Sequence, residues 1–199
     1  MPDAPIQSAT KENSQKNYQK EGDVAFREGD LTTAALLYKR AIDIDPQDAW
    51  AEYSLAEVYR CRGDIAHAVH HYIQSLKLDP FSSSSFIQLL FSKATPEQLG
   101  PIVTFYQQLS LDKPRNPWVN VRLGDLLTKQ RSVQSAIASY KAASYKLLNN
   151  KYPHYVSNHW DDNGSSEPTY IIIGPMKTAT SALYEYINQH PNVLPSIKK

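Results

Sequence analysis

Small and large apolar residues recur with a fixed period along most of the chain. The segments AIDIDP, SLKLDP and LSLDKP end at Pro46, Pro80 and Pro114, so successive prolines lie 34 residues apart. Tiles that start at residues 15, 49, 83 and 117 place alanine, glycine, leucine and tyrosine at matching offsets. A period of this length is typical of stacked helical hairpins, in which neighbouring repeats bury one another's apolar faces.

A pair of antiparallel helices explains the offsets. Glycine or alanine is expected where two backbones approach closely, and tyrosine or leucine where a gap between helices must be filled. Asp-Pro ends the second helix, because proline cannot continue a helix and restricts the residue before it. The residues that fit are Tyr18, Gly22, Ala34, Tyr38, Ala41 and Pro46, then Leu55, Ala56, Tyr59, Ala68, Tyr72 and Pro80, and finally Leu123, Gly124, Leu127, Ala136, Tyr140 and Ala143.

The third tile departs from this pattern. It keeps Leu89, Tyr106 and Pro114, but bulky Leu90 and Ile102 stand where the other tiles have small residues. Over residues 15–148 the chain resembles tetratricopeptide-repeat (TPR) proteins. The resemblance implies a mainly α fold, an α-solenoid of four repeats with a divergent third one. The polar stretch 1–14 before it is predicted to be disordered.

By this resemblance, the first helix of each repeat lines a concave wall that binds a protein or peptide. Trp50, Tyr53, Arg60 and Trp118 are the predicted partner-binding residues, since large rings dominate many interfaces. The two tryptophans could instead staple consecutive repeats, and the sequence leaves both interpretations open. By resemblance, the exposed positions of this wall are Lys16, Gln19, Asp23, Arg27, Trp50, Tyr53, Glu57, Arg60, Trp118, Val121, Asp125 and Lys129.

The acidic wall positions argue against one kind of partner. Some TPR proteins hold an acidic C-terminal peptide with a basic clamp. Here Asp23, Glu57 and Asp125 stand where that clamp requires amides. The sequence therefore does not predict such a peptide on this wall.

Composition and charge exclude several other classes of function. The chain has 199 residues, with 21 basic and 20 acidic ones, so electrostatics give no case for nucleic acid or an anionic membrane. A single cysteine, Cys61, forms no internal disulfide. No apolar leader or membrane-length apolar run is present, so a cytoplasmic location is expected. His67 and His71 have metal-ligand spacing, but no metal site is predicted, because no further ligand completes the set.

The C-terminal part has a different pattern. Residues 149–168 form a predicted linker rich in Asn, Asp, Gly, Ser and Pro. The run from Tyr170 to Ile173 predicts a strand buried on both faces, Gly174 a sharp exit, and the apolar spacing from Thr180 to Ile187 a helix. A loop that enters a helix N-terminus, with Lys177 and three hydroxyls, suits a phosphate or sulfate.

The position of the lysine decides between phosphate-binding families. A Walker A loop is a poor match, because Ala179 and Thr180 occupy its second glycine and its lysine. The segment instead resembles the 5′-phosphosulfate loop of sulfotransferases of the heparan-sulfate and bacterial type. Ala179 is a departure, since glycine is commoner there. The matching residues are Gly174, Lys177, Thr178, Ala179, Thr180, Ser181, Ala182, Leu183, His190 and Pro191.

This second resemblance implies a chemistry. The donor would be 3′-phosphoadenosine 5′-phosphosulfate (PAPS), without a metal, and the acceptor an alcohol or amine. Lys177 would be catalytic, stabilising charge on the bridging oxygen as the sulfuryl group leaves. The implied cofactor-binding residues are Gly174, Pro175, Met176, Lys177, Thr178, Ala179, Thr180, Ser181 and Ala182.

The two resemblances together predict the start of a sulfotransferase domain at residues 169–199, behind a TPR array. The catalytic base and the 3′-phosphate site of the family have no counterpart in the sequence, so we expect a truncated domain and no catalysis by this chain alone. The alternative is a non-catalytic TPR scaffold. A nucleotide kinase-like loop is a third interpretation, which ATP binding in preference to PAPS would support.

Overall fold

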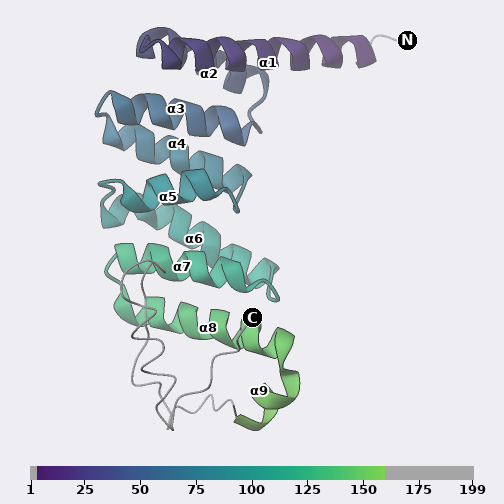
Figure 1. Cartoon of the computed structure of the whole chain (residues 1–199), viewed down its shortest axis with the longest axis vertical. Coiled ribbons are helices and arrows are strands. Elements are labelled where there is room, and N and C mark those ends of the chain that lie inside the picture. Colours follow the sequence, from purple (N-terminus) through teal and green to yellow (C-terminus); the bar gives the residue numbers. More distant parts are fainter. Residues whose placement is uncertain (1–3, 160–199) are drawn as a thin grey trace. The chain divides into compact units, whose positions relative to one another are not determined.

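The computed structural model describes residues 4–159, and all regular structure in this range is helical. The prediction of a mainly α fold is confirmed for this part, whereas the predicted strand and loop after residue 169 lie outside it. Figure 1 shows consecutive hairpins stacked on one another from α1 to α8. The helices are α1 Ala4–Arg27, α2 Leu31–Ile44, α3 Ala49–Cys61, α4 Ile65–Leu78, α5 Ser83–Phe91, α6 Pro96–Asp112, α7 Pro117–Lys129, α8 Val133–Lys151 and α9 Pro153–His159.

The 34-residue period also places the helix starts. Asp48, Ser82 and Asn116 are the N-caps of α3, α5 and α7, and each side chain accepts a backbone N–H of the first turn. These bonds satisfy donors that a helix start would otherwise leave unpaired. Asp30 and Asp64 cap α2 and α4 in the same way. The local sequence therefore fixes where most of these helices begin.

Small residues allow three of the hairpins to close tightly. The helices of α1–α2, α3–α4 and α7–α8 pack closely along their length. A Cβ added to Gly22 would lie 2.8 Å from the Tyr38 ring, and one added to Gly124 would lie 2.6 Å from the Tyr140 ring. Glycine is thus required sterically at these positions, and the tyrosine ring takes the space of a side chain.

The third hairpin is built differently. α5 and α6 approach each other less closely than the helices of the other pairs, and α6 packs against α4 and α7 instead. Leu90 and Ile102 account for this, because they add bulk where the other hairpins have small residues. Ile102 is fully buried. Phe86 and Tyr106 fill the wider gap, with ring centroids 6.1 Å apart.

Two cations of α7 hold α5 at its ends. Arg122 donates to the carbonyl oxygens of Pro80, Phe81 and Ser82 at 2.9–3.0 Å, just before α5. Lys129 donates to the carbonyls of Leu90 and Ser92, both at 2.7 Å, at the other end. These bonds satisfy carbonyls around a short helix that has no close backbone partner in α6.

Helices extend further at both ends than the sequence predicts. α1 begins at Ala4 and takes in most of the polar stretch 1–14, where alanine, glutamine, lysine and glutamate have good helix propensity. α8 continues to Lys151, and α9 lies within the predicted linker 149–168. Val156 of α9 is 4% exposed, so part of that segment is packed.

Candidate protein-binding face

The first helices of the four hairpins present equivalent positions at the 34-residue period. We call this set the odd-helix face. The spacing within each helix is i, i+3, i+7, which places the three side chains on one side of the helix. The face consists of Lys16, Gln19 and Asp23 on α1, Trp50, Tyr53 and Glu57 on α3, Ser84, Ile87 and Phe91 on α5, and Trp118, Val121 and Asp125 on α7.

The predicted aromatic residues of this face are accessible. Trp50 is 54% exposed and Trp118 59%, values that favour a binding role over a purely internal staple. The Trp50 and Tyr53 rings lie 5.2 Å apart by their centroids, so α3 carries a paired aromatic surface. Burial, followed by the nearby Glu57 carboxylate, raises the pKa of Tyr53. Trp118 stands on α7, two hairpins further along.

The acidic wall positions bond within the protein. Tyr38 donates to Asp23 at 2.7 Å and Tyr140 donates to Asp125 at 2.6 Å. Tyr72 donates in the same way to Glu57. Each pair joins the second helix of a hairpin to the first, and each acid is half-buried rather than exposed as predicted. The acids are therefore part of the hairpin structure.

These contacts also alter proton affinities. Burial first, and then the bond to Asp125, raises the pKa of Tyr140 to about 12. The pKa of Asp125 is raised by burial, against the opposing effect of the Tyr140 hydrogen bond. A higher carboxyl pKa reflects the cost of holding charge away from water. At neutral pH the tyrosine keeps its proton and acts as the donor.

The basic positions near the face are engaged as well. Arg60 pairs with Glu57 at 2.7 Å across one turn of α3 and remains exposed. The Arg27 Nε donates to the Asp23 carbonyl at 3.2 Å. Lys129, predicted as an exposed wall residue, is half-buried and holds the end of α5. Burial lowers the pKa of Lys129. Of the predicted cations, Lys16, Arg27 and Arg60 are exposed and therefore accessible to a partner.

Two apolar residues of the face were missed by the sequence interpretation. Phe91 is 84% exposed and Ile87, one turn earlier on α5, is 50% exposed. Phe91 occupies the position that is acidic in the other hairpins, and the Tyr106 hydroxyl donates to the Pro80 carbonyl instead, at 2.6 Å. The 34-residue period would have identified both residues, because it places them level with Glu57 and Tyr53.

The histidines of α4 bond to carboxylates. His67 Nδ1 lies 2.7 Å from Asp64, and His71 Nδ1 lies 2.7 Å from Glu52. Both imidazoles stack against the Tyr59 ring, at centroid distances of 4.9 and 5.4 Å. Over residues 4–159, no group of three or more metal-ligating side chains converges on one point. These contacts with Glu52 and Tyr59 of α3 show that the histidines help to hold α3 and α4 together.

The predicted phosphosulfate loop cannot be compared with the structure. Lys177 and the loop from Gly174 to Ala182 lie outside the described residues.

None of the helices described here combines the length and apolar character that crossing a bilayer requires.

Comparison with known proteins agrees with the repeat. Residues 22–60 match the family model described as TPR repeat. The match covers the end of α1, all of α2 and nearly all of α3. No curated protein matches the chain. The chain thus carries a TPR repeat at residues 22–60, within an all-helical array of stacked hairpins consistent with a TPR α-solenoid.

Proposed function

We propose that this chain is a protein-binding TPR scaffold, and that the odd-helix face forms the concave wall on which the partner docks. The observation that carries the proposal is the exposure of Phe91, which is 84% accessible beside Ile87. An apolar ring left in water at a repeat position is stabilised when a partner covers it, by about 25 cal/mol per Å² of apolar surface.

The composition of the face defines the partner's chemistry. Trp50, Tyr53, Ile87, Phe91 and Trp118 offer apolar surface, while Asp23, Glu57 and Asp125 already accept bonds from tyrosines. Arg60 supplies charge at one edge. A segment with two or three large apolar side chains, at helical or extended spacing, fits this arrangement better than a strongly charged one.

Peptide selection tests this function. A displayed peptide library is panned against the full chain, and enriched peptides are remeasured by fluorescence polarisation. We expect sequences rich in aromatic and aliphatic residues, with affinity falling at least tenfold in Phe91→Ser, or about 1.4 kcal/mol. Leu111→Ser is the matched control, because Leu111 is 73% exposed on α6 and outside the face. Equal losses in the two variants, or no enrichment, would contradict the proposal.

We further propose that the array serves PAPS-dependent sulfuryl transfer to an alcohol or amine, through a domain that begins near residue 169. The sequence from Gly174 to Leu183 supports this, since it combines a glycine exit, a lysine and three hydroxyls. Backbone amides and hydroxyls of residues 174–182 would hold the 5′-phosphosulfate, and Lys177 would lie against the bridging oxygen. PAPS supplies the sulfuryl group when bound.

Nucleotide titration tests the loop separately from the scaffold. In the isotopically labelled chain, we expect PAPS to shift the backbone amide resonances of residues 174–182 at lower concentration than ATP does. Lys177→Ala should remove this preference for PAPS over ATP, because it takes away the positive charge. Lys151→Ala, in the last turn of α8, serves as the control. Equal responses to ATP and PAPS would count against a phosphosulfate loop and leave the scaffold proposal untouched.

A further inference from the structure

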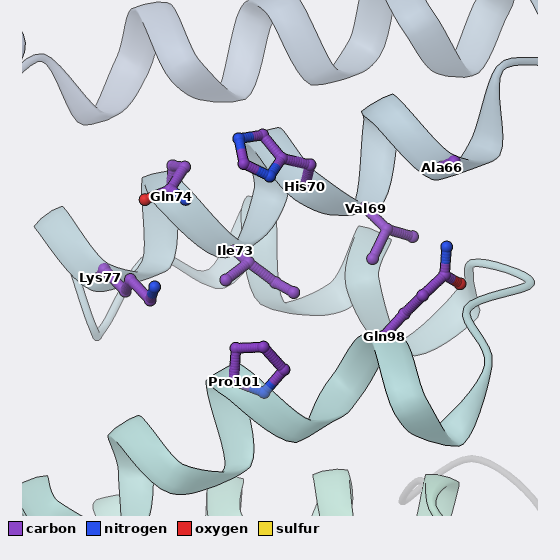
Figure 2. A pocket seen from close by; sticks show the side chains of 8 residues that line it. All are labelled: Ala66, Val69, His70, Ile73, Gln74, Lys77, Gln98 and Pro101. Atoms are coloured by element: carbon purple, nitrogen blue, oxygen red, sulfur yellow. The ribbon is translucent and has the colours of Figure 1, made fainter.

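The even-numbered helices carry a groove that the odd-helix face does not use. A hollow of about 360 Å³ lies between α4 and α6. Figure 2 shows Val69 and Ile73 pointing from α4 toward Gln98 and Pro101 on α6. The His70 ring, between them along α4, points away from α6, and Lys77 lies one turn beyond Ile73. Val69 and Ile73 are 2% and 6% exposed, so they form an apolar floor. The volume is in the range of pockets that hold a ligand or a few side chains.

Pro101 gives the α6 side of this groove an unusual property. It stands inside the helix and has no N–H, so the carbonyl of Glu97, one turn earlier, lacks the bond that residue 101 would normally donate. The exposed proline ring adds apolar surface at the rim, beside the amide of Gln98. The groove therefore combines an apolar floor on α4 with an apolar rim on α6.

The charge of the groove has one sign. Lys77 and His70 are the titratable residues that line it, and no carboxylate does. No ion pair holds the Lys77 ammonium within residues 4–159. The acid nearest along α6, Glu97, bonds to Thr95. A ligand carboxylate placed near Lys77 would thus gain attraction without displacing an internal partner.

We propose that the α4–α6 groove is a second docking site, for a peptide segment with a branched apolar side chain next to a carboxylate. The apolar side chain packs on Val69, Ile73 and Pro101. The carboxylate meets Lys77. This site is separate from the odd-helix face, so the array would hold two segments of one partner, or two partners, at the same time.

A set of three short peptides tests the site on the full chain. The probe is acetyl-Gly-Leu-Glu-Glu-Gly-amide, followed by amide chemical shifts of the isotopically labelled protein. The comparison peptides replace both glutamates by lysine, or the leucine by glycine. We expect shifts centred on residues 69–77 and 97–101, with affinity at least fivefold higher for the acidic leucine peptide than for either comparison peptide.

Charge reversal identifies the contact. Lys77→Glu should reduce affinity for the acidic peptide at least fivefold and favour the lysine peptide, whereas Lys20→Glu on α1 gives the same net charge and should change neither. Pro101→Ala should weaken binding about threefold, because it removes apolar surface at the rim of the groove. Shifts centred elsewhere, equal effects of the two charge reversals, or equally tight binding of the lysine peptide or an oligonucleotide would overturn the proposal.

Discussion

Gly124→Leu is expected to lower the free energy of unfolding by about 2–3 kcal/mol, because it forces a side chain into a tightly packed hairpin. Even a single Cβ at this position would lie 2.6 Å from the Tyr140 ring. The ring cannot move away freely, since its hydroxyl donates to Asp125. A leucine does occur at this repeat position in the third hairpin, as Leu90, and there the two helices lie further apart.

Urea unfolding followed by circular dichroism measures this loss, which corresponds to a melting temperature lower by roughly 4–12 °C. Ala138→Leu on α8 is the matched control, because it adds a large side chain to an exposed position of the same hairpin, and both residues are good helix formers. That change should alter the free energy of unfolding by less than about 0.5 kcal/mol. If Gly124→Leu were neutral, tight closure of α7 on α8 would not be a source of stability.

Arg122→Ala is expected to cost about 2–3 kcal/mol. The guanidinium donates to three consecutive carbonyls, those of Pro80, Phe81 and Ser82, and lies 4.5 Å above the centre of the Phe86 ring. Charge-assisted bonds of this kind contribute more than neutral ones, and the stacking adds a cation–π term. Removing the side chain leaves the start of α5 without its link to α7.

Two comparison variants separate this effect from a general loss of charge. Arg62 donates to the Leu31 carbonyl at 2.9 Å and to Thr32, but it is exposed and does not stack, so Arg62→Ala should cost less than about 1 kcal/mol. Arg122→Lys should recover little of the lost stability. A lysine ammonium lacks the planar fork of N–H donors with which the guanidinium bonds to three carbonyls. Thermal and urea unfolding measure all three, and equal losses for Arg62→Ala and Arg122→Ala would contradict the specific role.

The features that could be predicted are those encoded locally and repeated. The 34-residue period predicted helical hairpins, and Leu90 with Ile102 indicated which hairpin would diverge. The sequence did not reveal that the divergent hairpin moves α6 toward α4 and α7, since that depends on contacts between residues far apart in the chain. The α4–α6 groove follows from the same contacts, and no motif marks it.

The candidate face was predicted in part. The tryptophans were identified as exposed candidates, because aromatic residues at first-helix positions stand out in the pattern. The acids were predicted to be exposed, but each is half-buried and accepts a bond from a tyrosine that lies 15 residues later, on the opposite helix. Phe91 was missed because it does not match the residues typical of the repeat. It stands where the other three hairpins have an acid, and that difference marks it as unusual.

The two cations of α7 have a mechanical consequence for the array. Because Arg122 and Lys129 hold the two ends of α5, the third hairpin takes part of its rigidity from the fourth. The four hairpins are therefore not mechanically equivalent. A pulling force on α7 would therefore also act on the two ends of α5, so the third and fourth hairpins are mechanically coupled.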